Sequence, residues 1–121
     1  MKKAIKIDVA NQTVEMVEVD DSLESLYREI GCTCFQTIAF ADNKMDYIFV
    51  DEEGLFKEDV AGFTFGEYNQ PIVGNGLILG TDIESGESKD AVTPIEQIRD
   101  RVIWKTVAEI LEWRRLQGFA R

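Results

Sequence analysis

The alternation of apolar and polar residues at the N-terminus predicts a β-hairpin. Apolar residues occupy every second position from Ile5 to Val9, the period of a strand with one buried face. The polar pair Asn11-Gln12 separates this run from a second one, residues 13–19. In the second run the phase slips once, at Met16-Val17, so we expect either a β-bulge or a strand buried on both faces.

Residues 21–30 predict an amphipathic helix. Asp20, Asp21 or Ser22 can cap its first turn, and Gly31 stands at the position where glycine commonly ends a helix. Its apolar residues follow the spacing i, i+3, i+4 and i+7, namely Leu23, Leu26, Tyr27 and Ile30.

The middle of the chain reads as strands separated by turns. Residues 35–41 and 47–50 are strand candidates joined by a polar turn, and Leu55-Phe56 is expected to resume a strand. Residues 57–70 predict a loop that carries aromatic residues, with a short strand possible. The apolar run 72–80 predicts one central strand with a close backbone approach at its glycines, and residues 82–90 predict a surface loop.

The C-terminal segment, residues 93–117, predicts helical structure. Thr93-Pro94-Ile95-Glu96 has the pattern of a capping box with proline at the first helical position. The apolar stripe shifts along the segment, which leaves three interpretations: two helices that break near Trp104, one long helix, or a short strand at residues 102–104. Gly118 is the expected stop.

This order of elements predicts an α+β fold, with a mainly antiparallel sheet followed by one or more helices. The length of 121 residues fits a single domain. We expect residues 1–90 to form the sheet region, with the helix 21–30 inserted, and residues 93–117 to form the helical segment.

Composition argues against catalysis. The chain has no histidine, which excludes Ser-His-Asp and Cys-His nucleophiles and histidine-containing zinc sites. The C-x-C pair Cys32 and Cys34 lacks the spacing of a redox or zinc motif and is interpreted as two reduced thiols. The acidic turn 51–54 does not have the spacing of a calcium loop, and Gly74-Asn75-Gly76 lacks the third glycine of a dinucleotide fingerprint. We expect no enzyme activity, no metal and no cofactor.

The net charge of −10 is unevenly distributed. Residues 1–7 carry +3, residues 8–90 carry −15, and residues 91–121 carry +2 and hold five of the six arginines. The acidic excess argues against direct DNA binding. The chain has no long apolar run, so no membrane segment is expected, and the predicted location is the cytoplasm of a bacterial host cell.

Arginine binds phosphate through a bidentate fork, so the C-terminal segment is the predicted place for an anionic ligand. The alternative is that these arginines pair with acidic residues and that the aromatic residues only pack. The candidate ligand-binding residues, chosen for phosphate, base and edge contacts, are Phe65, Asn75, Gly76, Arg99, Arg101, Arg114 and Arg115.

The runs 48–55 and 71–76, together with the upstream hairpin and helix, resemble small uncharacterised proteins of phages and mobile elements over roughly residues 4 to 82. The size and layout are also similar to phage anti-defence sponges of the Thoeris-inhibitor kind. That resemblance implies a homo-oligomer that sequesters a cyclic nucleotide or cyclic ADP-ribose-like immune signal. Two alternatives are an acidic DNA mimic that inhibits a basic host nuclease, and an interaction module without a ligand.

Overall fold

The computed structural model describes residues 1–20, 22–40, 45–66, 68, 70–82, 84–85 and 87–117. Its strands are β1 (Lys2–Asp8), β2 (Thr13–Val19), β3 (Phe35–Ala39), β4 (Asp46–Asp51), β5 (Gly62–Phe65), β6 (Ile72–Val73), β7 (Gly76–Thr81), β8 (Ser88–Lys89) and β9 (Val102–Lys105). Its helices are α1 (Leu23–Ile30), the 3-10 helix η1 (Gly54–Phe56), α2 (Ile95–Arg101) and α3 (Val107–Leu116). The predicted α+β class is confirmed.

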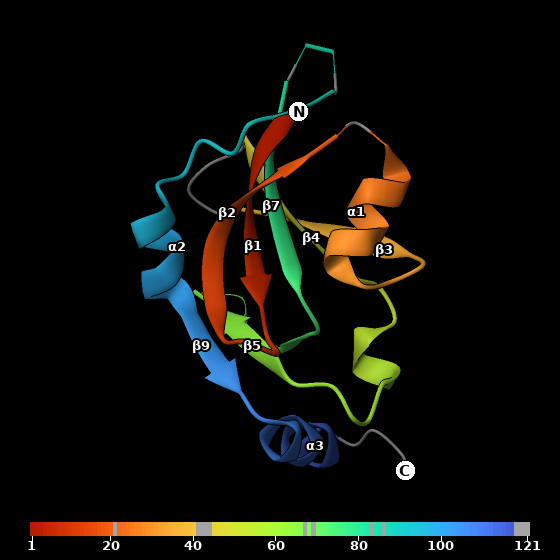
Figure 1. Cartoon of the computed structure of the whole chain (residues 1–121). Coiled ribbons are helices and arrows are strands. Elements are labelled where there is room, and N and C mark those ends of the chain that lie inside the picture. Colours follow the sequence, from red (N-terminus) through yellow and green to blue (C-terminus); the bar gives the residue numbers. More distant parts are fainter. Residues whose placement is uncertain are drawn as a thin grey trace.

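Two antiparallel sheets make up the fold (Figure 1). The larger sheet has the order β2-β1-β7-β4-β3, and β8 pairs with the end of β7. The smaller sheet has the order β6-β5-β9. Since β9 follows α2 along the chain and pairs with β5, the C-terminal segment is part of the second sheet as well as helical.

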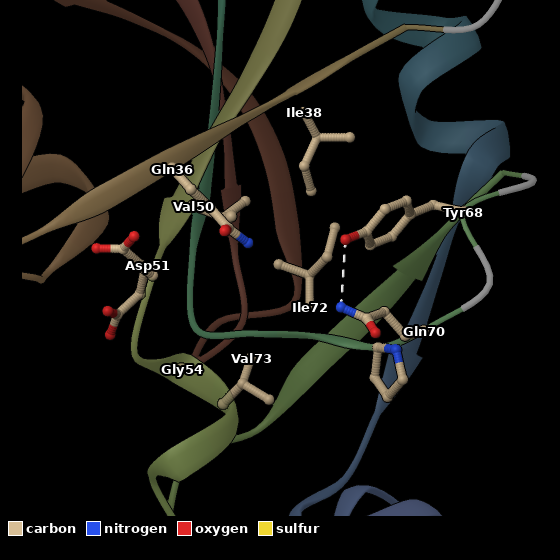
Figure 2. Close-up of a pocket in the computed structure, with 11 residues that line it drawn as sticks. Gln36, Ile38, Val50, Asp51, Gly54, Tyr68, Gln70, Ile72 and Val73 are labelled. Carbon is tan, nitrogen blue, oxygen red and sulfur yellow. Dashed lines mark hydrogen bonds between the residues drawn. The ribbon is translucent and has the colours of Figure 1, made fainter. Parts of the chain in front are cut away.

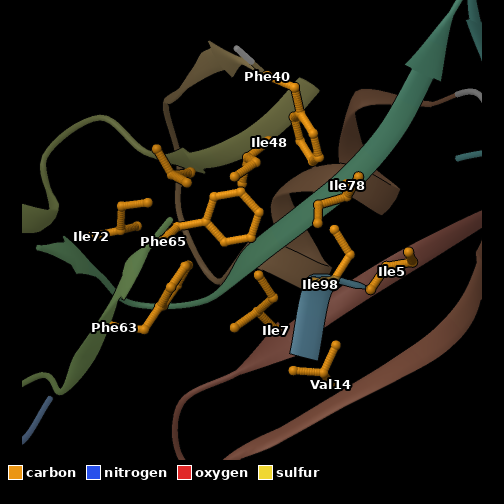
Figure 3. Packing of buried hydrophobic residues seen from close by; sticks show 11 residues of the cluster. Ile5, Ile7, Val14, Phe40, Ile48, Phe63, Phe65, Ile72, Ile78 and Ile98 are labelled. Atoms are coloured by element: carbon orange, nitrogen blue, oxygen red, sulfur yellow. The ribbon is translucent and has the colours of Figure 1, made fainter. Parts of the chain in front are cut away.

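The larger sheet is buried on both faces. Ile78 of β7 points into a core cluster shared with the smaller sheet and α2, which Figure 3 shows in close-up. Its neighbours Leu77 and Leu79 point to the opposite face and pack under α1 with Leu26 and Ile30. Successive side chains of a strand alternate between faces, so the continuous apolar run of β7 fits its central position.

The β1–β2 hairpin is regular. Its register runs without interruption from Lys2 opposite Val19 to Asp8 opposite Thr13, so the bulge alternative is wrong. Burial on both faces holds for one residue on each face, Val14 and Val19, while the residues between them are exposed or partly exposed. The phase slips because Val14 packs between the sheets while Val19 packs under α1.

Helix α1 confirms the predicted capping residues. The Ser22 hydroxyl accepts a hydrogen bond from the Ser25 amide at 3.1 Å, and Gly31 ends the helix with φ +79°. The described helix begins at Leu23, two residues later than predicted, and Asp21 lies outside the described residues.

The predicted central strand 72–80 is in fact two strands in different sheets. Gly74 adopts φ +91°, and its amide donates to the Ala61 carbonyl at 2.9 Å, which turns the chain from β6 into β7. The expected close approach is confirmed at Gly76, where an added Cβ would lie 3.1 Å from the Phe63 ring.

Two further expectations are wrong. Residues 54–56 form the 3-10 helix η1, because the amides of Phe56 and Lys57 donate back to Glu53 and Gly54. Thr93 is not the cap of α2: Pro94 holds the N-cap position, and the Thr93 hydroxyl donates to the Asp46 carboxylate instead. The short-strand alternative at residues 102–104 is confirmed as β9.

The tight contact between β5 and β6 predicts a large effect for Gly62→Ala. An added Cβ would lie 2.1 Å from the Ile72 carbonyl oxygen, so the two strands must separate. We expect the free energy of unfolding, measured by urea denaturation, to fall by about 3 kcal/mol. Gly31→Ala is the control: it meets nothing within 4 Å and costs only the left-handed backbone, about 1–2 kcal/mol. Equal losses for both variants would contradict the strand contact.

Candidate groove between the hairpin and β9

A groove of about 320 Å³ opens between the hairpin and the C-terminal segment. The hairpin contributes the end of its turn and the start of β2, and the opposite wall comes from α2 and β9, which lie beside β2 (Figure 1). Its lining residues are Gln12, Thr13, Val14, Glu15, Arg99, Val102 and Trp104. A volume of this size is at the lower end of small-molecule sites.

Arg99 is the cation of the groove. It lies in the last turn of α2, and its Nη2 donates to the Val14 carbonyl at 2.9 Å. A guanidinium carries five N–H donors in a planar fork, so the bond that fixes this side chain leaves capacity for an anion. Arg99 is the sequence-predicted arginine that the structure places in the groove.

Trp104 is the aromatic residue of the groove. In β9 it stands opposite Phe63, and the two rings meet edge to face with centroids 6.5 Å apart. The contact with Phe63 orients the indole, which is half-buried and contributes surface to the groove. An indole that lines the same groove as a guanidinium suits stacking of a planar ring that carries phosphate.

The hairpin turn gives the groove polar edges. Gln12 has φ +53°, an uncommon backbone conformation for a residue other than glycine. The turn is held by Asp8, whose carboxylate accepts hydrogen bonds from the Asn11 amide and side chain at 3.1 and 3.0 Å. Glu15 is exposed at the same groove and would repel phosphate, but its carboxylate suits the hydroxyl or amino donors of a ligand.

Arg101 and Phe65 form a separate cluster. The Arg101 guanidinium lies 5.9 Å from the Phe65 ring centroid and 5.8 Å from that of Phe40. Both rings are buried, and the structure brings this predicted pair together as a packing contact.

Asn75 and Gly76 are placed at the junction of β6 and β7. The Asn75 side chain accepts from the Val9 amide at 3.0 Å and donates to the Glu29 carbonyl at 3.3 Å, which ties β7 to the hairpin and to α1. Gly76 pairs with Ile7 in β1. Neither residue lines the groove described above.

Arg114 and Arg115 occupy opposite environments on α3. Arg114 is buried, and its Nη2 donates to the carbonyls of Gly54 and Lys57. Arg115 is exposed and forms a bidentate pair with Glu112 at 2.6 and 2.8 Å. The four arginines predicted to bind a ligand therefore lie in different places: Arg99 lines the groove, Arg101 packs on aromatic rings, and the α3 arginines lie outside the groove.

Sequence reasoning found one of the seven residues that line the groove, Arg99, and missed the other six: Gln12, Thr13, Val14, Glu15, Val102 and Trp104. They are contributed by two segments more than 80 positions apart, and only the pairing of β9 with β5 brings Trp104 to the hairpin. One feature of the sequence points to part of this set. A strand at residues 102–104, one of the three interpretations of this segment, places Val102 and Trp104 on one face.

Two other hollows differ from the groove. Figure 2 shows the first, where Tyr68 and Gln70 are joined by a hydrogen bond of 3.2 Å beside Ile72; with about 30 Å³ it has room for about one water molecule. The second, about 520 Å³, is a mostly apolar depression between α3 and Pro71, with Trp113 and Leu116 in its wall.

The cysteines lie away from the groove. Cys32 is partly buried, and burial raises the pKa of its thiol, which makes it less reactive at neutral pH. Cys34 is exposed. Among the residues that the structure describes, no cluster of three or more metal-ligating side chains occurs, and no helix there has the length and apolarity to span a bilayer.

The chain matches no curated protein and no solved structure. Residues 1–103 match a family described as Domain of unknown function (DUF3846). The matched region contains Arg99 and Val102 and ends one residue before Trp104. Since it covers most of the sequence, the chain belongs to the DUF3846 family.

Proposed function

We propose that this protein is a non-enzymatic binder that captures a cyclic nucleotide or a cyclic ADP-ribose-like molecule in the groove between the hairpin and β9. The observation that carries the proposal is the meeting of Arg99 and Trp104 in one groove of about 320 Å³. The guanidinium of Arg99 can bind phosphate, and the indole of Trp104 offers a surface on which a base can stack. Phosphate and base are the two parts that nucleotides have in common.

The remaining polar groups complete a nucleotide-like set of contacts. Glu15 can accept from ribose hydroxyls or from the amino group of a base, and Gln12 and Thr13 offer amide and hydroxyl groups at the rim. Arg99 is the one cation among the described residues that line the groove, which favours a ligand with few phosphates over a polyanion such as DNA.

A binder of this kind needs affinity and no turnover, which fits a chain without histidine. The resemblance to small phage proteins suggests the biological role. The protein would come from a phage and would sequester a nucleotide signal of bacterial immunity.

A specific observation also favours the DNA-mimic alternative. Among the residues of the sheet region that the structure describes, twelve carboxylates are exposed: Glu15, Glu18, Asp20, Glu24, Glu52, Glu53, Glu58, Asp59, Asp82, Glu84, Glu87 and Asp90. A mimic would bind a basic nuclease with an affinity that falls steeply with salt. Binding of a nuclease that does not depend on salt would count against this alternative.

The groove is tested by thermal unfolding with a panel of cyclic AMP, cyclic di-AMP, cyclic di-GMP and cyclic ADP-ribose. A ligand at 100 times its Kd stabilises by about 2.7 kcal/mol, a rise in Tm on the order of 10 °C for a domain of this size. Arg99→Gln is expected to weaken binding about 10- to 100-fold because a charge-assisted hydrogen bond is lost.

Arg115→Gln is the matched control, since it removes an exposed arginine outside the groove and should leave the shift unchanged. No shift with any member of the panel, or an equal loss in both variants, would remove the groove as a nucleotide site.

A further inference from the structure

Strand β9 leaves one backbone edge open. In the part of the chain that the structure describes, β9 pairs with β5 on one side and is the last strand of its sheet. The Gly66 amide donates to the Arg101 carbonyl at 3.0 Å, so the backbone of residue 101 faces β5. Because the direction of the backbone N–H and C=O groups alternates along a strand, those of Ile103 also point toward β5. Those of Val102 and Trp104 point toward the open edge.

The side chain at the middle of this edge strand is apolar and exposed. Ile103 keeps 60% of its surface accessible, while the other three residues of the strand are partly buried. An open strand edge with an exposed apolar residue is a template for pairing with another strand.

The geometry points to a second copy of this chain as the partner, paired antiparallel through β9 across a two-fold axis. If the axis passes between the two Ile103 residues, Val102 of each copy lies opposite Trp104 of the other. The outward-facing Trp104 amide of one copy then donates to the Val102 carbonyl of the other, and the bond repeats by symmetry. This register uses the backbone groups of Val102 and Trp104 that point to the open edge, and it places the two Ile103 side chains next to each other at the axis.

The distribution of charge also favours pairing of two copies through the C-terminal segment. Two copies of a −10 chain repel, and the C-terminal segment, with +2, is one of the two parts of the chain that carry no net negative charge. Antiparallel pairing brings the end of α2, with Arg99 and Arg101, toward the start of the other copy's α3, with Glu109 and Glu112. Lys105 falls opposite Arg101 of the second copy, and Glu109, 3.9 Å from the Lys105 ammonium, reduces this repulsion.

The pairing changes the groove. Val102 and Trp104 lie on one face of β9, and opposite residues of an antiparallel pair share a face. The second copy's Trp104 therefore lies beside Val102, at the border of the groove, and each copy would contribute an aromatic ring to the other's site. The dimer itself does not depend on the ligand, so it is tested separately.

Cross-linking tests the register. In a Cys32→Ser, Cys34→Ser background, Ile103→Cys places two thiols at a non-hydrogen-bonded pair with Cα atoms about 4.5 Å apart, within reach of a disulfide. Lys105→Cys is the control, because its two copies would lie about 13 Å apart. Mild oxidation should give a covalent dimer for Ile103→Cys alone. Failure of Ile103→Cys to cross-link, or equal cross-linking of both variants, would overturn the register.

Light scattering tests the dimer without new cysteines. The wild-type chain at about 100 μM should show twice the mass of 13.7 kDa, and Ile103→Lys should return it to the monomer because two cations would meet at the axis. Met16→Lys changes a residue of similar exposure, 49%, on an edge strand of the larger sheet, β2, and should stay dimeric. A wild-type monomer, or dissociation by Met16→Lys alone, would overturn the proposal; thermal shifts with nucleotides report on the groove independently.

Discussion

Replacing Asp46 with alanine is expected to lower the free energy of unfolding by about 3 kcal/mol or more. Asp46 is 0% exposed at the start of β4, and its carboxylate accepts from the Val92 amide at 3.0 Å. It also accepts from the Thr93 amide at 2.8 Å and from the Thr93 hydroxyl at 2.6 Å. These bonds join the larger sheet to the segment that leads into α2, and alanine would leave the buried amide and hydroxyl of Thr93 without this acceptor.

The measurement is urea denaturation followed by circular dichroism. Asp46→Asn keeps one acceptor oxygen and should lose less than Asp46→Ala. Asp90→Ala is the matched control: Asp90 accepts from the Lys3 amide at 2.8 Å, but it is exposed, so its loss should stay near 0.5 kcal/mol. If Asp46→Ala were no more destabilising than Asp90→Ala, the role of Asp46 in placing α2, and with it Arg99, would be contradicted.

Arg114→Met is expected to have the second large effect, a loss of about 3 kcal/mol. Arg114 is 1% exposed, and its guanidinium donates to the carbonyls of Gly54 and Lys57, so it attaches α3 to η1. Methionine fills much of the volume but leaves these buried carbonyls without that donor. Hydrogen exchange should show faster opening of α3 and η1 together.

Arg115→Met is the comparison on the same helix. Arg115 is exposed and water screens its pair with Glu112, so the free energy of unfolding should hardly change in this variant. The comparison also separates two roles for Arg114. If Arg114→Met kept the stability of the wild type but lost nucleotide binding, Arg114 would be a ligand-binding residue, and its structural role would be contradicted.

Local patterns were sufficient for the elements whose partners are close in sequence. The hairpin needs only the alternation from Ile5 to Val9 and a polar turn, and α1 needs only its spacing, its Ser22 cap and Gly31. The order of these elements was also enough for the α+β class. Such elements are decided by residues a few positions apart, which a sequence shows directly.

Elements decided by distant contacts were predicted less well. Thr93 has the pattern of a helix cap, but Asp46, 47 positions away, takes its hydroxyl. The two adjacent arginines of α3 read alike in sequence, and only the position of η1 buries one of them. The groove depends on β9 reaching the hairpin, so the sequence indicates Arg99 as a cation near a ligand but gives no sign that Trp104 lies beside the hairpin.

Mass spectrometry of the intact native protein tests the central claim most directly. The protein is sprayed from a volatile buffer with the four cyclic nucleotides present, and the mass of each bound ligand is read from the complex. The proposed function predicts that one of them remains bound to the wild-type chain, is lost in Arg99→Gln and is kept in Arg115→Gln. A wild-type chain that retains none of them, or an Arg99→Gln variant that retains the ligand equally well, would contradict it.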